Sequence, residues 1–506
     1  MNMLISSEIE FASHCIEPAT NDPAVEACDA LTAAHHRLCG CPRNGTDPSA
    51  FDVAEFDSAG FRGYTDHRHH ELSGPLCASA VDLVLMLRKM RENLARYKLD
   101  AERVAGPINI YFDNTNRDPV DSRSWGCHMN IQVSRAAFDS WSEHGWKSEP
   151  MIAHWIPFIS TTPPLFGSGK TGAEKGTAPV PFQLSQRSDH MTRVSCLETV
   201  ENKGLINERD EPLGDGERLA RFHVVALDTP RAEYTSFLRA GVIQCLLASL
   251  EEGLPLPDLS LENPLQAMAE VSRDLSMRRP LRLADGRTAT ALEIQYRLAE
   301  AVQDHLRAGC AASSVPDAEF IVACWIETLD HLSKHSPILC GRLDWRARLE
   351  LIRQARCAVP HSTEIDLLSD IQYGQFQGAF ERLENDHIIE RLEDFFPSKR
   401  LGPFRLLARD MARAKFLSRY GAHVVRADWH KIIVNDKNDC LWEISLDTSA
   451  NCRKVIAIPE QRDSWKTCLY KLRIAGIAVK TEIVDILFIE AGSTNQKEKA
   501  HDNQEN

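Results

Sequence analysis

The sequence lacks three features that would point to a membrane, to secretion or to nucleic acid. It has no apolar run long enough to cross a membrane, and its first residues carry acids where a signal peptide needs a basic start and a long apolar stretch. It has no excess of basic residues either, since its net charge is -14, which disfavours binding to nucleic acid or to an anionic membrane. We therefore expect a cytoplasmic protein that binds neither nucleic acid nor a membrane.

A disulfide framework is also missing, although the chain has fifteen cysteines. Their number is odd and their spacing is irregular, so we expect them to be reduced. One cluster, His35, His36, Cys39 and Cys41, has residue types that bind zinc. A zinc site usually needs a second well-spaced pair of ligands, which is not there, and we therefore favour a plain loop.

With 506 residues, of which 43% are hydrophobic and 26% charged, the chain can bury a large core. Strand and helix patterns are intermixed without a regular βαβ rhythm, which favours an α+β fold over a doubly wound parallel sheet. A break rich in Pro, Lys and Arg at 397–403 predicts a large domain (1–398) followed by a small C-terminal domain (399–491). The polar tail (492–506) is typical of disorder.

We expect strands at 4–12, 61–72, 108–112, 128–134, 182–185, 221–228 and 431–436, and helices at 76–97, 135–160, 232–253 and through much of 290–395. Residues 13–60 are rich in Pro, Asn and Asp after a short helical stretch, and this composition predicts a mobile loop or lid. Gly167, Gly169, Lys170 and Thr171 resemble the end of a phosphate-binding P-loop. Pro164 stands where that pattern needs a glycine, so we interpret this segment as a flexible Gly-rich loop.

Acidic side chains alternate along the first predicted strand. Residues two apart in a strand share a face, so Glu8 and Glu10 point the same way. Two carboxylates on a core-facing strand are costly unless they bind a cation, and hard oxygen ligands suit magnesium. The alternative is a solvated strand face near the terminus.

A denser ionisable patch follows in the second predicted strand. Arg62, Tyr64 and Asp66 alternate onto one face, and Glu71 comes soon after. A charged run is usually a solvated surface. This one is flanked by helix and strand patterns, which makes a catalytic edge credible.

Later segments add histidines and arginines. His128 shares a strand face with Asn130, although a lone histidine on a strand is more often structural than a ligand. The remaining candidates are Arg187, Arg209, Arg221 and His223. The arginines could hold phosphates through bidentate hydrogen bonds, or they could form structural ion pairs.

Together these pieces resemble one family, the Pup ligases and Pup deamidases/depupylases, relatives of glutamine synthetase. The resemblance runs from about residue 4 to 460 and is strongest to the depupylase branch. The run Phe-Gln-Leu-Ser-Gln-Arg-Ser-Asp at 182–189 is found in that branch, and residues 64–71 are similar to its segment Tyr-Val-Asp-His-Ala-His-Pro-Glu. Further matches lie at 206–207, 209–212, 221–224, 284–287, 344–345, 419–421 and 427–429.

The resemblance implies a glutamine synthetase-like large domain, with a mainly antiparallel sheet packed on helices, and ATP and magnesium as cofactors. The expected magnesium ligands are Glu8, Tyr64 and Glu71, with Glu10 and His128 as further candidates. The expected ATP-binding residues are Arg62, Trp429, Gly74 at a small-residue position, Arg187, Arg209, Arg221 and His223. Asp66 is implied to be the catalytic carboxylate.

Some family positions differ. The family's His-Glu-Asn is His128-Met129-Asn130 here, which we interpret as the loss of one active-site carboxylate and a weaker metal subsite. Glu208 and Leu213 also depart from the family pattern, as does the segment 227–230. We therefore expect a divergent member whose modifier is Pup-like but need not be Pup.

The leading hypothesis is an ATP- and magnesium-dependent enzyme that hydrolyses an amide or isopeptide bond at a glutamyl or glutamine acyl group of a small protein modifier. The runner-up is a ligase, in which ATP phosphorylates a C-terminal glutamate and a lysine of the target protein attacks the acyl phosphate with Asp66 as base. Two further hypotheses are a catalytically dead nucleotide- or modifier-binding scaffold, which Met129 supports, and a small-molecule ligase of the glutamine synthetase kind.

Overall fold

The computed structural model describes most of the predicted large domain and several strands of the small one. The described residues are 3–38, 55–56, 60–66, 69–115, 124–174, 176–210, 216–253, 255–309, 315–358, 388–397, 404, 407, 423–427, 431–435, 441–445, 454–460 and 482–485. Within this part of the chain, no helix is both long enough and apolar enough to cross a membrane.

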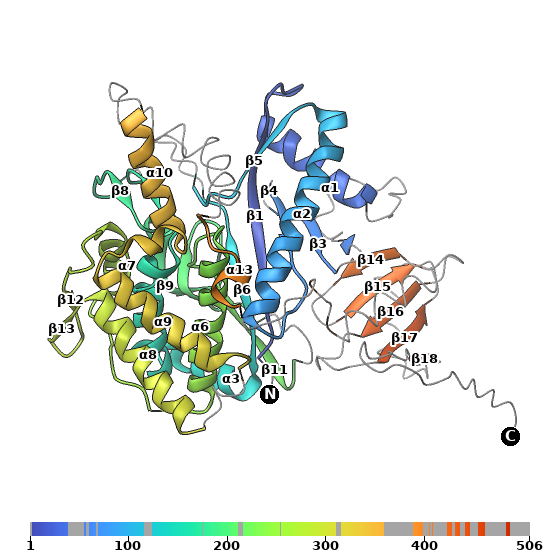
Figure 1. Ribbon diagram of the computed structural model, residues 1–506. Helices are drawn as coiled ribbons and strands as arrows, with labels where there is room; N and C mark the ends of the chain where they lie inside the picture. Colours follow the sequence, from blue (N-terminus) through green and yellow to red (C-terminus); the bar gives the residue numbers. More distant parts are fainter. Residues whose placement is uncertain are drawn as a thin grey trace, which may run out of the picture.

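One large sheet organises the N-terminal half of the described chain (Figure 1). Nine strands form it, in the order β2-β3-β4-β1-β6-β11-β10-β9, and β5 pairs with the far end of β1. Their bounds are β1 (Ile5–Cys15), β2 (Glu55–Phe56), β3 (Arg62–Asp66), β4 (His69–Ser73), β5 (Ile108–Tyr111), β6 (Cys127–Ser134), β9 (Met191–Cys196), β10 (Lys203–Asn207) and β11 (Leu219–Val224). Every pairing is antiparallel except that of β9 with β10, which confirms the predicted α+β fold with a mainly antiparallel sheet.

The central strand β1 shows why this sheet has one apolar and one polar face. Ile5, Ile9 and Phe11 are buried in the main hydrophobic core. Glu8 and Glu10 point to the other side, because neighbours along a strand alternate between faces. The apolar side chains therefore fasten the sheet to the helices, and the polar face is left for chemistry.

Helices cover the apolar face and build the rest of the large domain (Figure 1). They are α1 (Pro23–Leu38), α2 (Ala80–Ala105), α3 (Arg135–Trp146), α4 (Ile156–Ser160), α5 (Pro163–Phe166), α6 (Glu233–Glu251), α7 (Pro264–Arg273), α8 (Ala291–Arg307), α9 (Ala318–Ser333), α10 (Asp344–Ala358) and α13 (Leu392–Phe395), with a π-helix at Pro150–Trp155. α6 contacts α2, α9 and β6 and is buried nearly all round, which fits its lack of a polar stripe.

The C-terminal strands form a second sheet. β14 (His423–Ala427), β15 (Lys431–Asn435), β16 (Leu441–Ser445), β17 (Lys454–Glu460) and β18 (Glu482–Asp485) pair in chain order as an antiparallel meander, drawn in orange and red in Figure 1. The predicted boundary at 398 lies outside the described residues and stays a prediction. The segment before it is fastened to the large domain, because Arg88 of α2 contacts Glu233 of α6 at 2.5 Å and Glu393 of α13 at 2.6 Å.

Two predictions near the N-terminus are wrong. Residues 61–72 form a hairpin of β3 and β4 rather than one strand. His35 and His36, which we expected in a loop, lie buried in the last turn of α1. Their predicted companions Cys39 and Cys41 lie outside the described residues.

The predicted flexible loop at 167–171 is instead buried. Its Lys170 belongs to the short strand β7 (Lys170–Thr171), which pairs with β8 (Phe182–Gln183). The Lys170 ammonium lies 2.8 Å from a carboxylate oxygen of Glu174 and 3.2 Å from one of Asp189. Lys170 therefore makes buried structural ion pairs, which agrees with the interpretation that this segment is not a phosphate-binding P-loop.

Gly74, which follows β4, is explained by packing. A Cβ at this position would overlap the Sδ of Met86, which is fully buried on α2. The Gly74 amide and carbonyl are also fixed, since they hydrogen-bond to the Ser7 carbonyl and the Ser6 hydroxyl. The small residue therefore allows α2 to lie close to the end of β4.

We predict that Gly74→Ala lowers the free energy of unfolding by about 1–3 kcal/mol through overpacking. Gly74→Ala should cost less in a chain that already carries Met86→Ala, because the overlapping group is then gone. Urea unfolding of the two single variants and the double variant gives the coupling. Strictly additive losses would show that Gly74 is required for a reason other than Met86.

Candidate metal and catalytic site

Polar side chains from six adjacent strands meet on the polar face of the large sheet. The cross-strand pairs on this face are Arg62–Ser73, Tyr64–Glu71, Asp66–His69, Glu8–Ser73, Glu10–Glu71, Glu8–His128, Asn130–His223 and Asn207–His223. Residues directly opposite each other on neighbouring strands point to the same face. The register therefore brings together candidates that are far apart in the sequence.

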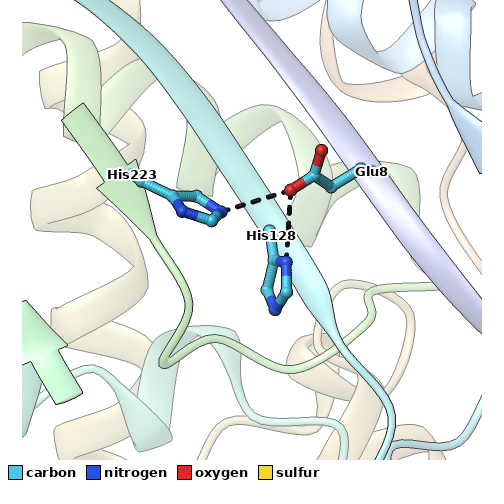
Figure 2. Close-up of side chains that lie close together, drawn as sticks. All are labelled: Glu8, His128 and His223. Atoms are coloured by element: carbon cyan, nitrogen blue, oxygen red, sulfur yellow. Dashed lines mark hydrogen bonds and ion pairs between the residues drawn. The ribbon is translucent and has the colours of Figure 1, made fainter. Parts of the chain in front are cut away.

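Glu8, His128 and His223 form the centre of this face. Figure 2 shows the three side chains reaching toward one another from β1, β6 and β11. The Glu8 Oε1 lies 3.2 Å from the Nδ1 of His128 and 3.2 Å from the Nε2 of His223. All three residues are buried, and their ligand atoms all lie within 4.8 Å of one another. This spacing is suited to one shared cation.

The charge states follow from burial and from these contacts. Burial disfavours an ionised Glu8, but the hydrogen bond with His128, the largest of several favourable contacts, holds the Glu8 pKa well below its usual range. Burial, with the nearby Arg221 guanidinium, lowers the pKa of His223 to about 3, so this ring is neutral. A neutral imidazole and a carboxylate are the forms that bind metal ions.

A second acidic group lies beside the first. Ligand atoms of Glu10, Asp66 and Glu71 also lie within 4.8 Å of one another. The Tyr64 hydroxyl donates a hydrogen bond of 2.6 Å to Glu71. Burial opposes the charge on Glu10, but His69, His128 and the Gly126 N–H, which donates at 2.8 Å, together lower the Glu10 pKa to about 2.

The surroundings of Glu71 disfavour its charged form. Burial raises the pKa of Glu71 well above its usual value, and the charges of Glu8, Glu10 and Asp66 raise it further. The Tyr64 hydrogen bond opposes this shift only in part. Several carboxyl groups this close together on one sheet face repel one another when ionised. A divalent cation would supply the positive charge that compensates them. The donor set fits: the Glu10 group offers only oxygens, and the Glu8 group adds two imidazoles.

Neighbouring polar groups fix the orientation of Glu8. The Arg221 guanidinium donates to the Asn130 Oδ1 at 2.9 Å, and the Asn130 amide donates to the Glu8 Oε2 at 3.4 Å. The Ser73 hydroxyl is 3.5 Å from the same oxygen and 3.0 Å from the Tyr64 hydroxyl. Arg221, an expected phosphate ligand, thus acts here on Asn130.

The other predicted nucleotide residues are placed as follows. Arg62 lies over the Tyr64 ring, with its guanidinium carbon 5.0 Å from the ring centre. Arg187 is fully buried and donates to the Trp125 carbonyl. Arg209 is half-buried and donates to the Leu197 carbonyl at 3.2 Å. Trp429 lies outside the described residues, so its predicted contact with ATP stays a prediction.

Met129 does not lie on the polar face. It alternates with His128 and Asn130 along β6, is paired with Ser7 and Val224, and is 0% exposed within the hydrophobic core. The interpretation of Met129 as a lost active-site ligand is therefore wrong, because a side chain at this position points away from Glu8. The argument for a dead scaffold loses its main support.

Sequence reasoning missed two residues of this face. Asn207 lies in the family-like segment 206–207, and its side chain contacts His223. Lys203, the first residue of β10, has no motif that marks it. Burial lowers the pKa of Lys203 to about 8, with a further contribution from Arg187 and an opposing one from Glu10. Neither β9 nor β10 is among the strands expected from the sequence, so alternation along a strand could not place either residue.

Comparison with known proteins identifies the family. The family model described as Pup-ligase protein matches residues 13–433. The Pup deamidase/depupylase of Mycolicibacterium smegmatis is 31% identical over 425 residues, covering 79% of this chain and 80% of that protein. The Pup–protein ligase of Saccharomonospora viridis is 30% identical over 355 residues, covering 67% of this chain and 74% of that protein. The chain belongs to the Pup-ligase family of enzymes, which confirms the resemblance.

Solved structures share the fold. The ligase PafA in the crystal structure of its complex with Pup superposes with a TM-score of 0.72 at 20% identity, covering 94% of this chain and 93% of that one. PafA in complex with ADP gives a TM-score of 0.65 at 23% identity, covering 79% of this chain and 88% of that one. The large sheet and its helices are thus a known architecture.

We predict that divalent-cation binding strengthens as the pH rises. The raised pKa of Glu71 keeps a proton on this carboxyl to higher pH than on an ordinary one, and a bound cation must displace that proton. The same raised pKa stabilises the cation-free protein at low pH, and this contribution is lost as the pH rises through the folded pKa.

Calorimetric titration with Mn²⁺ between about pH 5 and pH 7, in buffers of different protonation enthalpy, measures both the affinity and the protons released. Glu71→Gln should bind more weakly and with a smaller pH dependence. The exposed Glu262→Gln serves as the control. An affinity that does not change with pH in the wild type would contradict this account of Glu71.

Proposed function

We propose that this chain is an ATP- and magnesium-dependent enzyme that hydrolyses an amide or isopeptide bond at the terminal glutamyl group of a small Pup-like modifier. The observation that carries the proposal is that Asp66 lies with Glu10 and Glu71 in one acidic group, beside the Glu8 group on the same sheet face. The depupylase name of the Mycolicibacterium smegmatis relative supports hydrolysis. The predicted partner is therefore a modifier joined to a lysine of a target protein.

Two cation subsites suit the two groups of ligands. Glu10 and Glu71 offer oxygen atoms only, which is the chemistry that Mg²⁺ prefers, and Asp66 lies beside them as the proposed base. Glu8, His128 and His223 offer one carboxylate and two imidazoles, which also accept Mn²⁺ or Zn²⁺. Bound cations would neutralise this acidic face and the phosphates of a nucleotide.

Buried arginine supports the nucleotide part of the proposal. The Nε and Nη2 of Arg187 have no hydrogen-bond partner among the described residues, although the side chain is fully buried. Buried polar groups are almost always paired, and a guanidinium suits phosphate oxygens well. The ADP complex of PafA, which has the same fold, points the same way.

Asp66 is the group best placed to handle protons at the acyl carbon. It is the last residue of β3, is only half-buried, and lies within reach of Glu10 and Glu71. As a base it would take a proton from an attacking water molecule. The water oxygen bonds to the acyl carbon, the C–N bond breaks, and the proton passes to the departing nitrogen.

Ligation is the second candidate function, since the Saccharomonospora viridis relative at 30% identity is a ligase. Both reactions use an acyl carbon beside a carboxylate base, so the site geometry is compatible with either. The products distinguish them: a hydrolase releases ammonia or a free lysine, whereas a ligase consumes ATP stoichiometrically and forms a conjugate.

We predict that Asp66→Asn lowers the rate of hydrolysis by about 10²–10⁴-fold, as expected for loss of a general base. The assay incubates the protein with ATP, Mg²⁺ and either Pup ending in glutamine or a Pup–lysine conjugate, and follows products by mass spectrometry. Asp304→Asn, on the exposed side of α8, is the matched control and should keep full activity.

Two results would overturn the proposal. Conjugate formation from Pup ending in glutamate, with stoichiometric ADP release and no hydrolysis, would make the chain a ligase. Activity of Asp66→Asn equal to that of the wild type would remove Asp66 from the reaction.

A further inference from the structure

Asn207 forms a buried contact with one of the candidate metal ligands. It lies on β10 directly opposite His223 of β11, and both residues are at most 3% exposed. The Asn207 Oδ1 is 3.2 Å from the Nδ1 of His223. The other ring nitrogen of His223, Nε2, faces Glu8. Asn207 therefore stands behind the ring, on the side away from the centre of the site.

Backbone groups fix which way the Asn207 amide points. The N–H of Arg209 donates to its Oδ1 at 3.1 Å, and its Nδ2 donates to the carbonyl of Glu198 at 3.4 Å. A backbone N–H can only donate and a backbone carbonyl can only accept. Exchanging the oxygen and nitrogen of the amide would therefore break both contacts, so the atom that faces His223 is the oxygen.

This orientation decides the tautomer of His223. An amide oxygen has no proton to give, so the Nδ1 of His223 must carry the hydrogen of this bond. A cation binds the neutral form of the ring, in which Nε2 then carries the lone pair. That lone pair faces the Glu8 Oε1, a second acceptor, at 3.2 Å. Two acceptors so close together with no proton between them repel each other, and a cation bound to both removes the repulsion.

We infer that Asn207 is a positioning residue, which holds His223 in the Nδ1–H tautomer so that Nε2 and the Glu8 carboxylate are offered together to a divalent cation. The inference rests on the cation subsite of the proposed function. Hydrogen bonds from the outer nitrogen of a metal-binding histidine typically set its orientation and affect metal affinity 10–100-fold. Asn207 owes its own orientation to the backbone at Glu198 and Arg209, which flank β10.

The direct test is the tautomer itself. Nitrogen NMR of the full-length protein labelled with ¹⁵N-histidine distinguishes the two neutral tautomers, and His223→Ala assigns the signal. We expect the Nδ1–H form in the wild type without added cation. The Nε2–H form would overturn the inference, whatever the activity of the protein.

The functional test is Mn²⁺ affinity, measured by electron paramagnetic resonance without nucleotide. Asn207→Leu should weaken Mn²⁺ binding about 10–100-fold, and Asn207→Asp, which keeps an acceptor facing Nδ1, should restore most of it. Asn202→Leu is the matched control from the loop before β10, since the Asn202 side chain donates a hydrogen bond to the Glu198 carboxylate rather than to His223. Wild-type affinity in Asn207→Leu, or an equal loss in Asn202→Leu, would overturn the inference.

The two proposals fail in different ways. A wild-type protein that binds Mn²⁺ through His223 but hydrolyses no modifier would refute the proposed reaction and leave the role of Asn207 intact. A wild-type protein that binds no Mn²⁺ would refute both. A lower melting temperature of Asn207→Leu with an unchanged Mn²⁺-induced increase would show a merely structural role and refute the inference alone.

Discussion

The Glu8 carboxylate, buried between two imidazole rings, is the interaction on which the arrangement of this site depends. Burying a carboxylate is expensive unless hydrogen bonds or a cation compensate. Here neighbouring polar groups do so: His128 contacts the Glu8 Oε1, the Asn130 amide donates to the Oε2, and Arg221 holds Asn130. Three strands must keep a single register for these contacts to form, since a slip by one residue would turn the site side chains of the slipped strand toward the core.

Side chains that alternate along a strand also divide residues of the hydrophobic core from residues of the site. On β6, His128 and Asn130 face the site while Met129 between them is fully buried among apolar side chains. A difference from the family at position 129 therefore changes the core rather than the ligand set. Gly74 is a similar case, because its lack of a side chain is explained by Met86 of α2. At both positions, the departure from the family pattern is explained by packing in the core and not by a change in the ligands of the site.

Much of the fold and of the site could be predicted from alternation in single strands. Glu8 with Glu10, and His128 with Asn130, each share a face as period two requires. Glu71 could not be placed in this way. It comes five residues after Asp66, and residues an odd number apart in a single strand lie on opposite faces. The antiparallel pairing of β3 with β4 brings them together. The role of Asn207 depends on the pairing of β10 with β11, a long-range contact that no local pattern specifies.

The central claim is that this sheet face holds divalent cations at two adjacent groups of ligands. Anomalous diffraction from crystals of the protein grown with Mn²⁺ tests it most directly. The account predicts one anomalous peak in contact with Glu8, His128 and His223 and a second in contact with Glu10 and Glu71, beside Asp66. An ordered, unoccupied polar face at saturating Mn²⁺, with the carboxylates hydrogen-bonded only to protein and water, would contradict it.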